Sequence, residues 1–216
     1  MKVTVVDYGI GNLFSVGRAL QACGAEVVFA ADTAGVSGAG HLVLPGVGAF
    51  AGGMQGLRER GLVEPIRKHA LAGRPLLGIC LGMQMLATSS EEFGQHEGLD
   101  LIPGRVLAMP ADHAPPGSGS LKIPAIGWRQ LRPGPRGEWQ GTPLAGCEPG
   151  TSTYFVHSFH VVPDDEAHLL ASYAYGGHRI TAAIGKGRIF GTQFHPEKSG
   201  AAGLKILQAF LQLPAR

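Results

Sequence analysis

The 216-residue sequence is poor in the features that mark several special classes of protein. It has only three cysteines, Cys23, Cys80 and Cys147, too few and too scattered for a disulfide framework or a cysteine-based zinc site. A reducing, cytoplasmic location is the expectation that follows. No apolar run reaches the ~20 residues that a membrane-spanning helix needs, and the N-terminus lacks the apolar stretch and cleavage site of a signal peptide. We therefore expect no association with a membrane.

Charge is also sparse. Charged residues make up 16% of the chain and the net charge is +2, which gives no support for nucleic acid or a membrane surface as partner. The nine histidines are dispersed. His157 and His160 are three residues apart in TYFVHSFHVV, a spacing that sends them to opposite faces of one strand. The sequence predicts no metal site, and we expect no cofactor.

Glycine, in contrast, is abundant: the 34 glycines indicate many tight turns and close backbone approaches. The first half of the chain alternates short β-branched or apolar runs with helical patterns, which indicates a parallel sheet with helices on both faces. In such sheets, sites gather at the carboxyl ends of the strands. The expected strands are 2–7, 25–30, 41–46 and 75–79, and the expected helices are 11–24, 50–72 and 81–90.

The second half changes character. Segments 110–120 and 132–141 are rich in Pro and Gly and are expected to be surface loops. Four strand-like runs then follow, with hairpin turns at 175–178 and 185–187, before a helix over 199–213. These strands are 153–159, 168–175, 179–185 and 188–195. We predict one α/β domain over 1–216, with three layers, a mostly parallel central sheet flanked by helices, and additional antiparallel strands in the second half.

Cys80 lies in GICLG, between Gly78 and Gly82, where a strand gives way to a helix. A free cysteine is more often a small buried hydrophobe than a reagent. However, Gly-x-Cys-x-Gly at such a junction has the pattern of the nucleophile elbow, in which flanking glycines permit a sharp turn. A helix N-terminus would favour the thiolate, and the N–H of Leu81 would face the same space. The elbow favours a nucleophile.

A base is available in GTQFHPEKS. His195 and Glu197 are two residues apart at the end of an expected strand, so their side chains would face the same way. Glu197 would accept a ring N–H from His195 and fix its tautomer, as the third member of a catalytic triad does. The alternative is an ordinary exposed turn.

The loop LPGVGAF, residues 44–50, has two glycines after a strand. Its backbone could turn an N–H of Val47 or Gly48 toward Cys80 as a second oxyanion donor, a contact worth roughly 3 kcal/mol in a transition state. A tight turn that needs positive φ is the alternative.

Together, GICLGMQ, PGVG and QFHPE resemble the nucleophile segment, oxyanion loop and His–Glu pair of the class I (triad) glutamine amidotransferases. The resemblance implies a flavodoxin-like fold and glutamine as substrate. It implies that a thiolate attacks the side-chain amide, releases ammonia and forms a glutamyl thioester that water hydrolyses. By position, Cys80 matches the nucleophile, His195 the general base and then acid, Glu197 the orienting carboxylate, and Val47 and Leu81 the oxyanion donors.

The same resemblance implies a set of residues around the bound glutamine: Gly48, Gln84, Glu92, His157, Ser158 and Phe159. Three of them have simple alternatives. Gln84 could be a solvated helix residue, Glu92 an exposed acid, and His157 a satisfied strand histidine. Gln84 lies one helical turn beyond Cys80, which favours a place in the site.

Longer stretches are similar to the glutaminase subunits of imidazole glycerol phosphate synthases, in order and over nearly the whole chain: DYGIGNLFSVGRAL, PGVGAF, SEE, IGW, TYFVHS and FHPEKSG. In that family the subunit docks on a (β/α)8-barrel cyclase as a heterodimer, and ammonia passes through the barrel in histidine biosynthesis. Asn12 and Trp128 fall in segments that the family uses near the partner. A helix cap and a core aromatic are their alternatives.

The chain departs from this family in one motif. Relatives show Pro-His-x-Gly-Trp-Asn, whereas residues 124–129 read PAIGWR. Ala125 and Arg129 therefore bear on inter-subunit contacts and not on the triad. Segments 110–120 and 132–141 are also longer than is usual. Two other functions stay open: a glutaminase that serves another acceptor, as in pyridoxal phosphate, anthranilate or nucleotide synthesis, and a non-catalytic binding protein of the same fold.

Overall fold

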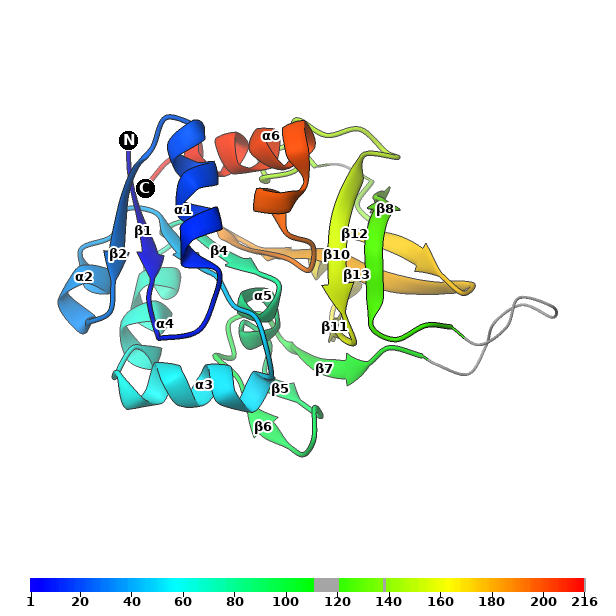
Figure 1. Ribbon diagram of the computed structural model, residues 1–216, viewed down its shortest axis with the longest axis horizontal. Coiled ribbons are helices and arrows are strands. Elements are labelled where there is room, and N and C mark those ends of the chain that lie inside the picture. Colours follow the sequence, from blue (N-terminus) through cyan, green and yellow to red (C-terminus); the bar gives the residue numbers. More distant parts are fainter. Residues whose placement is uncertain (111–120, 138, 216) are drawn as a thin grey trace.

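The computed structural model describes residues 1–110, 121–137 and 139–215. Within them, one mixed sheet of eight strands has the order β2-β1-β3-β4-β14-β13-β12-β9 (Figure 1). Its parallel part consists of β1 (Lys2–Val6), β2 (Glu26–Ala30), β3 (Leu42–Leu44), β4 (Leu76–Ile79) and β14 (Ile189–Thr192). Its antiparallel part consists of β13 (His178–Lys186), β12 (Leu169–Tyr175) and β9 (Arg132–Pro133). The predicted α/β architecture is confirmed.

Helices cover both faces of this sheet (Figure 1). The period of two along each strand explains why: Val5 packs toward α1 (Leu13–Ala22) and α6 (Gly200–Leu211), whereas its neighbour Val6 packs toward the opposite layer. That layer contains α2 (Thr33–Ser37), α3 (Phe50–Glu59), α4 (Val63–Leu71) and α5 (Leu81–Met85). The central strands β3, β4 and β14 are wholly buried, and the carboxyl ends of these parallel strands meet at one edge of the sheet.

Two smaller sheets flank the main one. β8 (Ala125–Gln130) pairs antiparallel with β10 (Ser152–His157). The other has the order β11-β7-β5-β6 and contains β5 (Ser89–Ser90), β6 (His96–Glu97), β7 (Gly104–Ala108) and β11 (Phe159–Pro163). Two short 3-10 turns, η1 (Glu166–His168) and η2 (Pro196–Lys198), complete the elements. Of the strands in these two sheets, the sequence indicated only β10; β5 and β6 have two residues each, too few to show a period.

Several predicted boundaries are wrong. The helix expected over 50–72 is two helices, because the chain turns at Gly61, whose φ is +63°. The helix expected over 81–90 ends at Met85. The strand expected over 153–159 breaks at Ser158, so that His157 and His160 lie in different sheets rather than on opposite faces of one strand.

Other predictions have mixed outcomes. The hairpin at 175–178 is confirmed, with Gly176 and Gly177 between β12 and β13, and β13 and β14 are joined by a turn that contains Gly187. Segment 132–141 is not wholly a loop, because Arg132–Pro133 forms the edge strand β9. Residues 111–120 lie outside the described residues. Across the described chain, no helix is long and apolar enough to cross a membrane, and no three His, Cys, Asp or Glu side chains form a metal-binding group.

Candidate active site

Cys80 sits on a strained turn between β4 and α5, with φ 55° and ψ −110°. Its backbone N–H donates to the carbonyl of Thr192 at 2.7 Å. A Cβ added to Gly78 would lie 2.6 Å from the carbonyl oxygen of Gly82, and one added to Gly82 would lie 1.8 Å from that of Leu44. The glycines are therefore required for close backbone approach, as the elbow interpretation predicts, while the positive φ falls on the cysteine itself.

Cys80 is 8% exposed and borders a cavity of about 350 Å³. The cavity brings together ten of the residues that the sequence indicated, from segments far apart in the chain: Val47, Gly48, Cys80, Leu81, Gln84, Glu92, His157, Ser158, Phe159 and His195. Phe93, Pro124 and Val156 also line it and were not foreseen. No sequence pattern singled out Phe93, which follows two glutamates and is 87% exposed in the structure.

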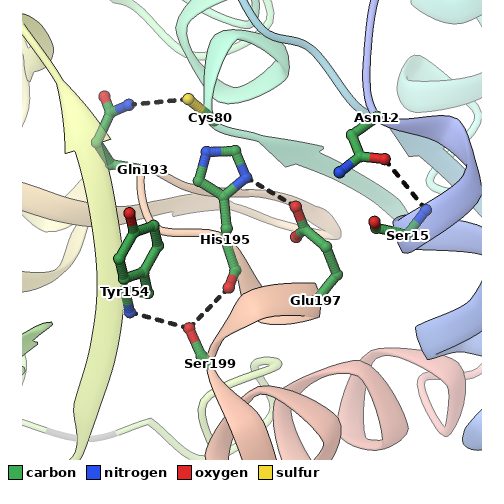
Figure 2. Close-up of polar contacts among 8 residues, drawn as sticks. All are labelled: Asn12, Ser15, Cys80, Tyr154, Gln193, His195, Glu197 and Ser199. Atoms are coloured by element: carbon green, nitrogen blue, oxygen red, sulfur yellow. Dashed lines mark hydrogen bonds and ion pairs between the residues drawn. The ribbon is translucent and has the colours of Figure 1, made fainter. Parts of the chain in front are cut away.

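His195 and Glu197 form a buried pair next to this cavity (Figure 2). Nδ1 of His195 lies 2.8 Å from Oε1 of Glu197, and the two side chains are 3% and 1% exposed. Because the carboxylate only accepts, Nδ1 donates its proton to Glu197, and Nε2 is the ring nitrogen left to exchange a proton with another group. Glu197 lies in the turn η2, which Pro196 begins, and His195 is the residue just before that turn, so the pair is not at the end of a strand as expected. The contact was predicted correctly for the wrong local reason.

The electrostatics of His195 follow from its neighbours. Burial lowers the pKa of the imidazole, but its interactions with Cys80 and Glu197 outweigh burial and raise the pKa to about 9. Among the described residues Nε2 has no hydrogen-bond partner. Figure 2 shows the ring between the Cys80 side chain and the Glu197 carboxylate. This arrangement suits transfer of a proton from the thiol to Nε2.

A second support holds the His195 backbone. The hydroxyl of Ser199 donates to the His195 carbonyl at 2.7 Å. The hydroxyl oxygen of Ser199 also accepts from the backbone N–H of Tyr154 at 3.0 Å (Figure 2). The His195 N–H donates to the Tyr154 carbonyl at 3.0 Å. Sequence reasoning missed Ser199, which joins η2 to β10.

The oxyanion side is arranged differently. The N–H of Leu81 donates to the carbonyl of Gly46 at 3.3 Å, so this expected donor is already engaged. The hydroxyl of Tyr8 donates to the carbonyl of Pro45 at 2.9 Å and fixes the preceding peptide. Burial, and then the nearby Cys80, raise the pKa of Tyr8 far above its usual value. Gly48 has φ +95°, which only glycine adopts readily.

Two of the expected substrate residues, Glu92 and His157, are buried and hydrogen-bonded. Glu92 accepts from the N–H of Phe50 at 2.6 Å and thereby caps the start of α3. His157 donates from Nδ1 to the Phe159 carbonyl at 2.8 Å, and its Nε2 accepts from the Tyr173 hydroxyl at 2.8 Å. Burial lowers the pKa of His157 to about 4, so its ring is neutral at pH 7. Glu92 is thus no exposed acid, and His157 is a satisfied strand histidine that also lines the cavity.

Gln84 is likewise buried and not solvated. Its amide nitrogen donates to the Phe159 carbonyl at 3.0 Å and to Oε1 of Gln193 at 3.1 Å. Gln193 in turn donates from Nε2 to the sulfur of Cys80 at 3.8 Å (Figure 2). No local pattern singled out Gln193, although it stands two residues before His195.

The residues expected near a partner lie outside the cavity. Asn12 caps α1, with its side-chain oxygen 3.2 Å from the N–H of Ser15. Trp128 is 52% exposed on β8 and is therefore not a core aromatic. Arg129 places its guanidinium 5.3 Å from the ring centre of Tyr175 and donates to the Trp128 carbonyl at 3.0 Å. Ala125 is buried at the start of β8, opposite His157.

Comparison with known proteins bears on this geometry. The model of the family described as glutamine amidotransferase class-I matches residues 4–213. The chain belongs to this family. Imidazole glycerol phosphate synthase subunit HisH 1 of Legionella pneumophila (strain Paris) is 49% identical over 214 residues, which cover 98% of this chain and 99% of that protein. Subunit HisH of Geobacter sulfurreducens is 47% identical over 213 residues, covering 97% of each chain. Within the glutamine amidotransferases, this chain is thus similar to the HisH subunits over nearly its full length.

Solved structures agree on the fold. A crystal structure of a glutamine amidotransferase has a TM-score of 0.72 at 20% identity and covers 97% of both chains. The structure of PurLQS from Thermotoga maritima has a TM-score of 0.71 at 23% identity with the same coverage. At this identity the likeness concerns the fold alone, which is the predicted class I glutamine amidotransferase architecture.

Proposed function

We propose that this chain, as one glutaminase domain, hydrolyses glutamine to glutamate and ammonia and passes the ammonia to a (β/α)8-barrel cyclase subunit. That partner would make imidazole glycerol phosphate in histidine biosynthesis, in the cytoplasm. The observation that carries the proposal is the buried His195–Glu197 pair beside the strained Cys80 at one cavity, in a chain 49% identical to a HisH subunit.

In the proposed mechanism, Nε2 of His195 takes the proton of the Cys80 thiol, while Glu197 holds Nδ1–H and stabilises the imidazolium. The thiolate attacks the amide carbon of glutamine. His195 then gives the proton to the departing ammonia and leaves a glutamyl thioester. Water, deprotonated by the same Nε2, attacks the thioester and regenerates the thiol. The raised pKa of His195, about 9, supports a ring that holds the transferred proton at neutral pH.

The oxyanion loop supports a dependence on the partner. The Gly46 carbonyl accepts the N–H of Leu81, so one of the two proposed donors is not free in this conformation. Rotation of the peptide between Gly46 and Val47 would release Leu81 and turn the Val47 N–H toward the cavity. Each donor is worth roughly 3 kcal/mol in the transition state. We expect weak glutamine hydrolysis by the subunit alone and stimulation by the liganded cyclase.

Exposed apolar side chains support a docking face near the cavity. Val47 and Phe93 line the cavity and are 40% and 87% exposed, and Ile126 and Trp128 are exposed on β8. Large apolar side chains grouped in this way are typical of a protein interface. Bound glutamine would contact Gly48, Gln84, Glu92, Ser158 and Phe159, which border the same space.

The test is a glutaminase assay of wild type and Cys80→Ala, each with and without the cyclase subunit and its ligand. We expect stimulation of wild type by the liganded cyclase, and loss of glutamine use in Cys80→Ala with ammonia-dependent synthesis retained. Equal wild-type rates with and without the cyclase would contradict the activation. Loss of both activities in Cys80→Ala would mean that Cys80 is structural, and failure to form a complex with the cyclase would favour another ammonia acceptor.

A further inference from the structure

Gln193 is fully buried below the cavity and directly follows β14. Its backbone N–H donates to the carbonyl of Ala182 at 2.8 Å, which fixes the residue to the neighbouring strand β13. Figure 2 shows its side-chain amide directed at the sulfur of Cys80. A buried amide with both ends bonded holds one orientation, because any other would leave polar atoms unpaired.

The direction of this amide is set by a backbone carbonyl. The Phe159 carbonyl only accepts, so the atom of Gln84 that faces it at 3.0 Å must be the amide nitrogen. That nitrogen also faces Gln193 at 3.1 Å, so the atom of Gln193 on that side must be the oxygen. The nitrogen of Gln193 is therefore the atom 3.8 Å from the sulfur. The sulfur receives an N–H, which favours the thiolate over the thiol.

Other donors to the sulfur are few. The helix α5 after Cys80 has only five residues, so its macrodipole is weak. The N–H of Leu81 is engaged by Gly46. Gln193 donates a side-chain hydrogen bond to this sulfur, and His195 also interacts with it.

We propose that Gln193 is a positioning residue that holds and stabilises the Cys80 thiolate, and that Gln84 orients it through a relay anchored at the Phe159 carbonyl. This inference rests on the proposed glutaminase function and deepens it. It also changes the expected role of Gln84: both amide hydrogens are used within the protein, so only its oxygen remains to accept a hydrogen bond from the substrate.

The titratable groups around the sulfur come from several elements. His195 lies after β14 and Tyr8 after β1, while Glu92 and His157 line the same cavity. Glu197 acts on the sulfur through His195. All of these groups are retained when Gln193 alone is changed. A difference in the titration of the Cys80 thiol between wild type and a Gln193 variant therefore reports on the Gln193 amide.

The experiment measures the rate of Cys80 alkylation by iodoacetamide against pH, with the modified peptide quantified by mass spectrometry to separate Cys80 from Cys23 and Cys147. On the acid side of this curve the alkylation rate rises with pH, and we call this part the acid limb. In Gln193→Met, which keeps the length of the side chain but removes the donor, the midpoint of the acid limb should move to higher pH by about 0.5–1 unit. In Gln193→Glu it should rise further, because a carboxylate next to the thiolate repels it. Glutaminase kcat with the cyclase should fall about three- to tenfold at pH 7 in Gln193→Met, with a smaller change in KM.

Gln55→Met is the matched control: Gln55 is exposed on α3 and its amide donates to Glu59, so the acid limb and kcat of this variant should equal those of wild type. An unchanged acid limb in folded Gln193→Met would overturn the inference. If Gln193→Met does not fold, Gln84→Met removes the residue that orients Gln193. An unchanged acid limb in Gln84→Met would then overturn the inference. Because alkylation needs no turnover, a wild type without glutaminase activity would contradict the proposed function and leave the test of Gln193 intact.

Discussion

The two sides of the cavity around Cys80 differ in how completely they are built. On the nucleophile side, sulfur, imidazole and carboxylate stand on strand ends and a short turn, and the His195–Glu197 pair is buried and bonded. On the oxyanion side, a glycine loop turns the Gly46 carbonyl toward Leu81 and engages the N–H expected to stabilise an oxyanion. The His195–Glu197 contact is already formed in this conformation, whereas under our proposal the oxyanion donors become free only after the Gly46–Val47 peptide rotates.

The largest effect is expected on the nucleophile side. Glu197→Gln keeps an acceptor for Nδ1–H of His195 but removes the charge that stabilises the imidazolium. We expect glutaminase kcat/KM to fall by about 10²–10⁴-fold, the range for loss of an orienting carboxylate. Ammonia-dependent synthesis by the complex serves as control and should not change. A fall of less than threefold would show that this side is less completely built than we infer.

The next effect concerns the backbone that joins the two sides. Gly82→Ala places a Cβ 1.8 Å from the Leu44 carbonyl, just before the oxyanion loop. Neither backbone can yield locally, so we expect the free energy of unfolding to fall by roughly 3 kcal/mol. Gly52→Ala on α3 is the control, because its Cβ meets open space and should stabilise the helix by up to about 1 kcal/mol. Denaturant unfolding measures both, and equal effects would contradict the close packing.

A pH effect should separate the two sides further. The pKa of His195 in the folded protein, about 9, lies above the ordinary imidazole value of 6.5, so the protonated ring stabilises the fold. This contribution is complete below about pH 6.5 and is lost as pH rises through about 9. The difference in free energy of unfolding between wild type and His195→Gln should therefore fall over that pH range, by no more than about 1.4 kcal/mol per pH unit. A flat difference curve would mean that the pair does not hold a proton.

The smallest effect is expected at the loop. Tyr8→Phe removes the buried hydroxyl that holds the Pro45 carbonyl. We expect a loss of about 1 kcal/mol, seen as a decrease in Tm of roughly 2–4 °C. The acid limb of Cys80 alkylation should shift far less than in Gln193→Met. A larger shift than in that variant would show that Tyr8 belongs to the nucleophile side.

Local patterns predicted the fold class and the turn at Cys80, and the resemblance to the class I glutamine amidotransferases supplied most of the other cavity residues. Short apolar runs identified the buried parallel strands, and the glycines at Gly78 and Gly82 indicated the elbow. The broken helix at Gly61 and the strand break at Ser158 were missed, because helical patterning continues on both sides of Gly61 and β-branched and aromatic residues stand on both sides of Ser158. Two expected residues have different contacts from those foreseen: Gln84 uses its amide hydrogens within the protein, and the N–H of Leu81 is engaged.

By itself, the order of residues determined which groups are chemically able to act: a thiol between glycines, an imidazole two positions from a carboxylate, and a loop of small residues. Tertiary structure alone decided what each group touches. Gln193 meets a sulfur 113 positions away, and Gly46 meets the N–H of Leu81, through packing of strand ends that no local pattern encodes. Hydrogen bonds act over about 3 Å, whereas sequence patterns report only on neighbours along the chain.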